Sequence, residues 1–497
     1  MIYFYDDSSI AGISNLERVP GPVEKLGQVL KPDQPSDGQS CMSFCSSIVP
    51  LEERGWRLYY SVFEAGLRGI AVAESSDGRH WEKPMLGQLN VAGKDSNRLA
   101  VAGLSEGVTR YGQPQVCRTA TGVWQMYFWV NHRPFLRYVL AESNDGLEWE
   151  VADFDRPVIY HPLELGSWIW TPGVPPPVDD AGSGPDQKAL EAFVPGPEAQ
   201  WGHLLEQLDT DELVRLKRLR ANDAVYIYRD EEAGLYEFYA PWPLCNVEGS
   251  SRRIEHDNAP FMVRAIHRRT STDGLQWSDG ELLIAPDESD PLDQQFYYLA
   301  QHRQQGWRIG MLGSYPVHDQ TMDIELCFSR DGRHWERPVR TPWIPREDPE
   351  EAGMVFAPNR LIDDGEQWLL LYTASPGRHG DVSERSTICA ARFPKHRFLG
   401  LRTPAGGIGY LWTRPFLLGG TEIRVDAQID GSLRAELCEP FGRPLPGFTK
   451  ANTSVISGDS TSHVLSWKGA DPRHYVHNAV SLRLEVERGR VFNIHWA

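Results

Sequence analysis

A short turn motif, S-x-D-G-x-x-W, occurs four times in this chain of 497 residues. Asp-Gly is a strong turn signal, because glycine accepts a positive φ and the aspartate side chain hydrogen-bonds to nearby backbone amides. Each copy follows a segment with strand-like alternation, and its tryptophan starts another strand. The copies run from Ser75 to Trp81, Ser143 to Trp149, Ser271 to Trp277 and Ser329 to Trp335. A motif that recurs in this way predicts a fold made of repeated β units.

An aromatic strand precedes every copy of the motif. A glycine introduces each of these strands, at Gly55, Gly122, Gly234 and Gly306. A fifth segment, QWLLLYTA from Gln367, leads into STICAARF and FLGLR without an Asp-Gly turn. The unit is therefore strand, glycine turn, aromatic strand, loop, strand, Asp-Gly turn and Trp strand. Five such units predict an all-β fold with a five-bladed β-propeller over residues 1–403.

The spacing of the motif is uneven, and the long gap predicts an insertion at about residues 171–221. It opens with the loop-like run TPGVPPPVDDAGSGPD. Two segments of helical character follow, and Asp209 and Glu212 resemble a capping box before the second. We expect a short helical insertion, which is either an exposed excursion or a lid over a pocket.

Beyond about residue 404 the motif no longer occurs. The run TEIRVDAQIDGSLRAELCE predicts a hairpin that turns at Asp430-Gly431, and alternating apolar residues return near Leu482 and Phe492. Residues 404–497 therefore predict a C-terminal β-sandwich packed on the propeller.

Composition excludes several classes of partner. The formal net charge is -18, which disfavours binding to nucleic acid or to an anionic membrane. The N-terminal sequence has no basic and apolar leader, so we expect a cytoplasmic protein unless a leader has already been removed. Seven scattered cysteines without a C-x-x-C pair predict buried thiols, not a disulfide or zinc framework. The oligomeric state stays open.

A propeller with S-x-D-G-x-x-W turns and a C-terminal β-sandwich resembles the glycoside hydrolases of the invertase/levanase and arabinanase/xylosidase type. It is also similar to bacterial family 32- or 43-like glycosyl hydrolases. The resemblance implies a carbohydrate substrate, such as a furanoside or related oligosaccharide, and hydrolysis of its glycosidic bond. The family's motifs for catalytic acids do not recur here: N-D-P-N-G is absent near the first blade, and Arg229-Asp230 is followed by Glu231. Candidate acids therefore have to come from propeller geometry.

Inner strands of a propeller begin near its axis, so acids at those positions are catalytic candidates. Alignment of the five inner-strand starts gives Asp37, Gln113, Asp223, Asp293 and Glu351. Glycosidases need one carboxyl group as proton donor and another as nucleophile or base. We assign the donor to Glu351 and the nucleophile or base to Asp223. Asp37 and Asp293 would adjust the pKa values of these acids or bind sugar hydroxyls.

Further residues are substrate-binding candidates. Sugar faces stack on aromatic rings, and Trp168, Trp170 and Trp242 lie in segments that predict loops. Polar candidates are Glu237, which is flanked by aromatic residues, Asp323 on a strand, and His379 in the loop PGRHGD. Arg133 and Arg264 are weaker candidates for binding hydroxyl or carboxylate groups.

Two alternatives remain at the level of sequence. One is a propeller without catalysis that binds carbohydrate or another protein. The other is a glycoside phosphorylase, which needs a cluster of Arg, Lys or His for phosphate. We expect no cofactor and assign no metal ligands, although carboxylates around an axis are compatible with a calcium ion.

Overall fold

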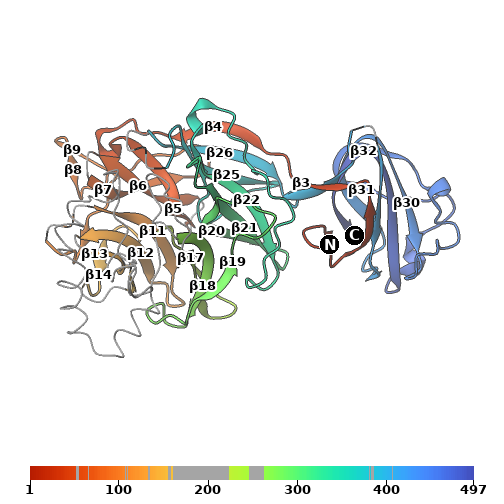
Figure 1. Cartoon of the computed structure of the whole chain (residues 1–497), viewed down its shortest axis with the longest axis horizontal. Coiled ribbons are helices and arrows are strands. Elements are labelled where there is room, and N and C mark those ends of the chain that lie inside the picture. The colour runs from red at the N-terminus through yellow and green to blue at the C-terminus, as the bar shows by residue number, and fades with distance from the viewer. Residues whose placement is uncertain are drawn as a thin grey trace.

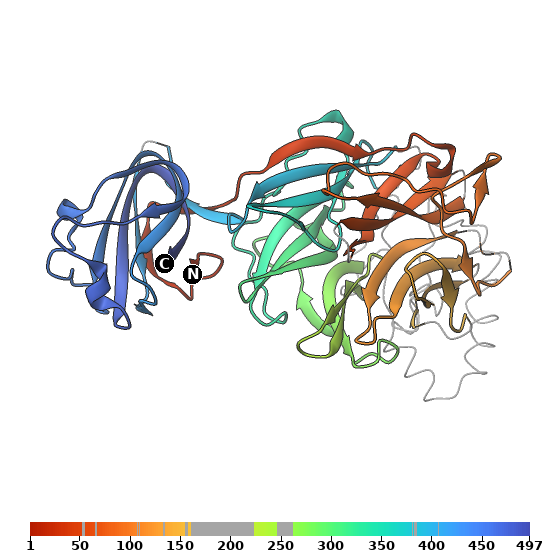
Figure 2. The same ribbon diagram turned by 180° about the vertical axis from the view of Figure 1, so that it is seen from behind.

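The structure, a computed structural model, describes the chain except for residues 52–54, 65–66, 107, 109, 133–134, 155–157, 161–222, 246–261, 380, 382–384 and 406. The described residues form strands and a few 3₁₀ turns (Figures 1 and 2). The predicted helical insertion lies outside the described residues. No helix of the described residues is long and apolar enough to cross a membrane.

Five groups of antiparallel strands follow one another along the chain. Group 1 has β5 (Ser40–Pro50), β6 (Trp56–Glu64) and β7 (Leu67–Ser75). Group 2 has β11 (Arg110–Arg118), β12 (Trp124–His132), β13 (Phe135–Ser143) and β14 (Trp149–Val151), with β10 (Val101–Ala102) and β15 (Ile159–Tyr160) at its edges. Group 3 has β16 (Tyr226–Asp230), β17 (Leu235–Cys245), β18 (Met262–Ser271) and β19 (Glu281–Ile284).

Groups 4 and 5 complete the series. Group 4 has β20 (Gln294–Gln304), β21 (Trp307–Pro316) and β22 (Asp323–Ser329). Group 5 has β23 (Met354–Phe356), β24 (Ile362–Asp364), β25 (Gln367–Ser375), β26 (Thr387–Pro394) and, from the N-terminal part of the chain, β4 (Glu24–Leu30). A small hairpin, β8 (Asn90–Val91) with β9 (Lys94–Asp95), lies between groups 1 and 2.

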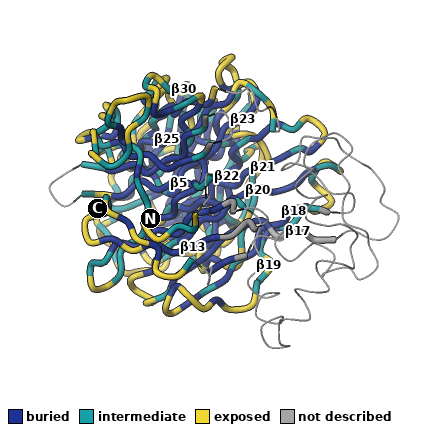
Figure 3. Tube along the Cα trace, turned by 90° about the vertical axis from the view of Figure 1, so that its left-hand side faces the viewer, coloured by how far each residue is buried: buried dark blue, intermediate teal, exposed yellow. Residues whose placement is uncertain are grey.

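Contacts between these groups close a ring. Each group contacts the next, and β25 of group 5 packs against β5 of group 1. In that last contact the backbone N–H of Ser43 donates to Thr373 Oγ1 at 2.8 Å. The inner part of the ring is buried and its outer loops are exposed (Figure 3). The ring of antiparallel groups is a β-propeller, as the repeated motif predicts.

The S-x-D-G turns are structural. At Ser143, the hydroxyl oxygen accepts from the backbone N–H of Asp145 at 3.3 Å and of Gly146 at 2.9 Å. The Asp145 carboxylate in turn accepts from the N–H groups of Leu147 and Glu148. The same pattern of serine and aspartate contacts recurs at Ser75, Ser271 and Ser329. The turn motif thus satisfies its own backbone amides.

Replacing Ser143 with Ala should lower the free energy of unfolding by about 1–3 kcal/mol, because buried amides lose their acceptor. Urea denaturation measures the change. The matched control is Ser105→Ala in a loop, for which we expect less than about 0.5 kcal/mol. Equal effects of the two substitutions would contradict the structural role of the turn serine.

The second body is a nine-stranded sheet that curls on itself. Its C-terminal strands are β27 (Leu399–Arg402), β28 (Ile408–Thr413), β29 (Phe416–Leu417), β30 (Ile423–Cys438), β31 (Ile456–Val464) and β32 (Ala479–Trp496). Three N-terminal strands join them: β1 (Ile2–Tyr3), β2 (Ile10–Ser14) and β3 (Glu17–Pro20) pair with β32, β28 and β27. Both chain ends lie in this body (Figure 1).

Four details differ from the expectation. The motif tryptophan starts a strand only at Trp149, whereas Trp81, Trp277 and Trp335 lie outside the strands. Residues 2–20, which we assigned to the propeller, pair with the C-terminal sheet instead. The FLGLR segment is β27 of that sheet, so β4 and not FLGLR is the outer strand of group 5. The Asp430-Gly431 pair is a bulge within the continuous strand β30 and not a hairpin turn. A Cβ on Gly431 would lie 2.4 Å from Glu487 O, so this glycine serves a close backbone approach.

Aromatic residues join the two bodies. The Tyr5 ring stacks on Phe328 of group 4 with centroids 4.2 Å apart and meets the edge of Trp307 at 5.3 Å. The Tyr3 hydroxyl lies 2.5 Å from His396 Nδ1. One hydrophobic core therefore runs from the sheet into group 4.

Candidate functional site

The five inner strands are β5, β11, β16, β20 and β23, the first strand of each group. Strand direction alternates within a group, so the third strand ends at the face opposite to the start of the first. The S-x-D-G turns follow the third strands, and the inner-strand starts therefore gather at the other face. We call that face the axial end.

Aromatic side chains from four groups meet on the axis below the strand starts. Phe44 lies 4.7 Å from Phe356, and Tyr226 lies 5.7 Å from Tyr298, between ring centroids. The Tyr226 hydroxyl donates to the Ala357 carbonyl at 2.6 Å, and the Ala357 N–H donates to the Tyr298 hydroxyl at 3.0 Å. These residues are all buried. They form a rigid apolar floor under the axial end.

Gln113 holds the start of group 3 in place. Its side-chain oxygen accepts from the Tyr138 hydroxyl at 2.6 Å and from the Ala224 N–H at 3.1 Å. Its Nε2 donates to Asp223 Oδ2 over a long 3.5 Å, while its own N–H donates to Ser61 Oγ at 2.9 Å. Asp223 is partly exposed. Gln113, the inner-strand start that has no acid, thus contacts Asp223, the acid of the neighbouring group.

Three residues around this site have strained backbones. The φ angles of Cys45, Gln113 and Ala224 are +47°, +55° and +67°. A non-glycine residue at positive φ costs about 1–3 kcal/mol, and such residues cluster at functional sites. Here all three occur where the inner strands of groups 1, 2 and 3 approach the axis.

Arg68 brings a positive charge to the same site. Its guanidinium carbon lies 4.0 Å from the ring centre of Phe63 and 4.9 Å from that of Trp129. Burial, followed by the charge of Arg110, lowers the pKa of Arg68 to about 10, while the charge of Asp223 opposes this shift. Among the described residues, none accepts a hydrogen bond from Arg68 Nε. The group stays cationic at neutral pH and is available to an anion.

Arg110 lies beside it, because the two arginines are register partners where β11 meets β7. The two positive charges repel each other, so this pair does not stabilise the junction between the strands. It is a feature expected of a site that receives negative charge.

A second cluster comes from groups 3, 4 and 5. Arg264 Nη1 donates to Gln295 Oε1 at 3.2 Å, and its guanidinium lies 4.9 Å from the Tyr297 ring centre. His379 Nε2 lies 2.9 Å from the Tyr297 hydroxyl, and its ring is 5.4 Å from that of Tyr315. Tyr297 is also among the groups that act on the pKa of Arg68, so this second cluster lies on the same side of the ring as Arg68. His379 and Arg264 both contact Tyr297, and their role in substrate binding stays a prediction.

The predicted acids differ in their surroundings. Asp293 is partly exposed, and its Oδ2 accepts from the His318 N–H at 3.0 Å. Asp37 is fully buried and pairs with Lys83 at 2.7 Å. Glu351 is 2% exposed and pairs with Lys25 at 2.5 Å, on the outer strand of group 5.

Tyr372 also donates to Glu351, at 2.5 Å. A buried carboxylate that pairs with a lysine links two segments of the chain. The lysine and the other hydrogen-bond partners take the place of the water that would otherwise surround the carboxylate. The structure thus gathers Asp223 and Asp293 as accessible acids, and it places Asp37 and Glu351 in buried ion pairs.

Two polar substrate-binding candidates are ion-pair partners as well. Glu237 is 1% exposed and binds Arg268, Arg303 and Arg308 at 2.7, 2.8 and 2.5 Å, between groups 3 and 4. It lies near the start of β17, and so at the face of the S-x-D-G turns. Asp323 is at the axial end of β22, and Arg346 Nε donates to it at 2.7 Å.

The predicted stacking residues remain untested. Trp168 and Trp170 lie outside the described residues, as does Arg133. Trp242 belongs to strand β17 opposite Ala265, and not to a loop as predicted; its side chain is not described.

No group of three or more His, Cys, Asp or Glu in the described part of the chain could hold a metal ion. The six cysteines whose side chains are described are free thiols, and five of them are buried.

Sequence reasoning missed Arg68, Arg110, Tyr138, Tyr297 and Tyr315. Arg68 begins the third strand of its group, and no motif marks that position. A signal was available at Gln113, since it broke the run of acids in the alignment of inner-strand starts.

Comparisons with known proteins give structural neighbours only. No family model and no curated protein matches the chain. A solved structure described as a glycoside hydrolase is 13% identical with a TM-score of 0.48, and covers 75% of this chain and 92% of its own. A thermostable family-43 glycoside hydrolase is 15% identical with a TM-score of 0.45 (72% and 92% covered). Beta-1,2-mannobiose phosphorylase from Listeria innocua is 12% identical with a TM-score of 0.44 (77% and 97% covered). The chain is similar to these solved structures at low sequence identity.

Proposed function

We propose that this protein cleaves glycosidic bonds at the axial end of its propeller, with Asp223 as a catalytic carboxylate. The observation that carries the proposal is the setting of Asp223. It is partly exposed, Gln113 Nε2 contacts it, and its charge acts on the pKa of Arg68 above the apolar floor of the axial end. Sugar sites combine flat apolar surfaces with a few fixed polar groups in this way.

In hydrolysis, Asp223 acts as nucleophile or base, and Asp293 is the partner that protonates the leaving oxygen. Both stand at inner-strand starts of adjacent groups. Water supplies the oxygen that joins the anomeric carbon, and the leaving sugar takes the proton. Glu351, the donor expected from sequence, is less suited to this role because Lys25 and Tyr372 occupy both of its oxygens.

Phosphorolysis is a second candidate, favoured by the Arg68–Arg110 pair. A phosphate oxygen attacks the anomeric carbon, the glycosidic C–O bond breaks, and one carboxyl group protonates the leaving oxygen. This reaction needs only one catalytic acid, for which Asp223 suffices, together with cations that hold phosphate.

Incubating a panel of oligosaccharides with the protein, with and without inorganic phosphate, tests both hydrolysis and phosphorolysis. Release of free reducing sugar without phosphate supports hydrolysis, and formation of a sugar 1-phosphate supports phosphorolysis. Carbohydrate binding without turnover in either condition would favour a non-catalytic propeller and would contradict the proposal.

Arg68→Gln separates the two reactions further. If phosphate is the nucleophile, the variant should raise the KM for phosphate by about tenfold to a hundredfold, since a charged hydrogen bond is lost. The matched control is Arg392→Gln, a partly exposed arginine on β26 that pairs with Glu24 on β4. A hydrolase would show no dependence on phosphate in either variant.

A further inference from the structure

A pocket of about 550 Å³ lies on the curled C-terminal sheet, in a different body from the axial end of the propeller. Its polar lining comes from the end of β27, the middle of β30 and the central part of β32. These residues are Arg402, Thr403, Gln428, Asp430, Arg488 and Arg490. Three arginines around one pocket are unusual in a chain whose net charge is -18.

Strand register places two of these arginines directly opposite each other. Arg402 on β27 pairs with Arg490 on β32, and Arg490 pairs on its other side with Gln428 on β30. Partners in antiparallel register share one face of a sheet, and like charges in such a pair destabilise it. We call Arg402, Arg490 and Gln428 the arginine row. Repulsion between its two arginines destabilises the sheet, and a bound anion would relieve that repulsion.

The charges of the row are only partly balanced. Arg402 Nε and Nη2 both donate to Glu17 Oε1, at 3.0 and 2.6 Å. Arg490 donates to the Pro20 carbonyl at 3.4 Å, and no carboxylate among the described residues pairs with it. Burial, and then the charges of Arg402 and Arg397, lower the pKa of Arg490. Glu17 pairs with Arg402, and Asp430 lines the pocket, so two carboxylates stand against three guanidinium groups and one positive charge remains.

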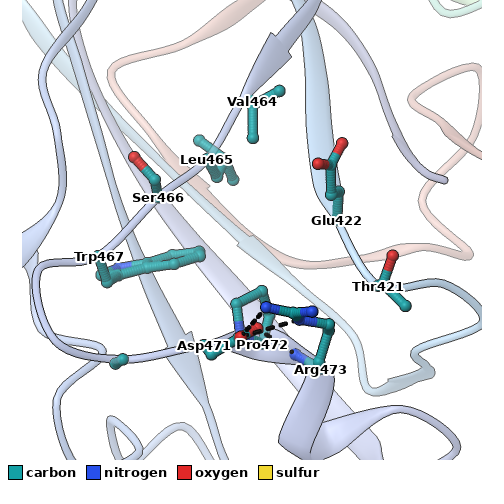
Figure 4. A pocket seen from close by; sticks show the side chains of 10 residues that line it. Thr421, Glu422, Val464, Leu465, Ser466, Trp467, Asp471, Pro472 and Arg473 are labelled. Atoms are coloured by element: carbon teal, nitrogen blue, oxygen red, sulfur yellow. Dashed lines mark hydrogen bonds and ion pairs between the residues drawn. The ribbon is translucent and has the colours of Figure 1, made fainter.

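A second pocket on the same sheet contains an arginine whose charge is neutralised by a carboxylate (Figure 4). That pocket has a volume of about 390 Å³, and Arg473 lies on its wall. Arg473 Nε donates to Asp471 Oδ2 at 2.8 Å, and Glu422 lines the pocket as well. Its guanidinium already has a carboxylate partner, so this pocket carries no free positive charge.

We propose that the Arg490 pocket binds an anionic group, either the carboxylate of an acidic sugar or a phosphate. Both present oxygens to which a guanidinium donates two parallel hydrogen bonds. The bound group neutralises Arg490 and relieves its repulsion with Arg402. The pocket is a binding site separate from the axial site, and it does not depend on the reaction performed there.

Isothermal titration calorimetry of the full chain tests this, with sodium phosphate and sodium glucuronate as probes at constant ionic strength set by sodium chloride. All proteins carry Arg68→Gln, which weakens phosphate binding at the axial end, and any axial binding that remains is common to every variant. The variants are Arg490→Gln and Arg490→Lys, and Arg473→Gln is the control. We expect binding of at least one probe, about tenfold or more weaker in Arg490→Gln, weakened less in Arg490→Lys, and unchanged in Arg473→Gln.

Binding of phosphate alone identifies a phosphorylated or inorganic ligand, whereas binding of glucuronate alone identifies an acidic sugar. The proposal is overturned if the parent binds neither probe, or if Arg490→Gln binds as tightly as the parent. Thermal melting gives an independent check. Either bound probe should raise the Tm of the parent and of Arg473→Gln, but not that of Arg490→Gln; equal shifts in all three would also overturn it.

Discussion

Asp223→Asn should lower glycoside-cleaving turnover by about a thousandfold while leaving the fold intact. Asparagine keeps the shape of the side chain and can still contact Gln113, but it cannot serve as nucleophile, base or proton donor. Because Asp223 is partly exposed and forms no ion pair in the described residues, its replacement should change the Tm little. Turnover is measured on the best substrate of the oligosaccharide panel.

The matched comparison is Asp37→Asn, the same chemical change at an acid that is buried against Lys83. That variant should lose about 3–5 kcal/mol of stability, because a buried ion pair is broken and Lys83 keeps only Asp33 as a counter-charge. Its turnover per folded molecule should stay near the wild-type value. A near-wild-type rate for Asp223→Asn would exclude Asp223 and move attention to Asp293.

Glu237→Gln should destabilise the protein by about 3–5 kcal/mol. The wild-type carboxylate neutralises arginines from three strands of groups 3 and 4, and glutamine leaves those charges to repel one another. Urea denaturation measures the loss, and Glu336→Gln at an exposed position of group 4 is the control. If Glu237 instead bound sugar, the variant would keep its stability and raise the KM for substrate.

The same substitution should change how stability depends on pH. Burial raises the pKa of Glu237, but the hydrogen bonds and charges of Arg308 and Arg268 outweigh it, so the net pKa is lowered. A lowered pKa in the folded state gives stability that is present above the unfolded value of about 4.3 and is lost as pH falls below it. The wild type should therefore lose stability more steeply than Glu237→Gln below about pH 4.3. An equal loss of stability in the wild type and in Glu237→Gln below about pH 4.3 would contradict this.

The propeller could be predicted because its turns are local. Ser143, Asp145 and Gly146 form their hydrogen bonds within a few residues of each other, so the motif that specifies them is visible in the sequence. The strands on either side show alternation for the same reason, since one face of each packs in the core. Asp430-Gly431 has the same turn dipeptide, but in the structure it forms a bulge within β30. Its conformation depends on the backbone of Glu487, which is distant in the sequence.

The candidate site could be predicted only in part. The inner-strand alignment predicted Asp223 and Asp293, which the structure leaves partly exposed, and Gln113 as the position without an acid. It could not tell them from Asp37 and Glu351, because the lysines that neutralise those acids, Lys83 and Lys25, are 46 and 326 residues away.

By itself, the sequence determined the repeated β unit, the structural role of its turns and the ends of the strands that carry the acids. These depend on short-range hydrogen bonds and on side-chain alternation. The tertiary structure alone decided that β4 closes group 5, that residues 2–20 join the C-terminal sheet, and that Asp223 is close enough to influence the pKa of Arg68. The physical reason is that strand pairing and charge neutralisation between distant segments leave no periodic trace in either segment.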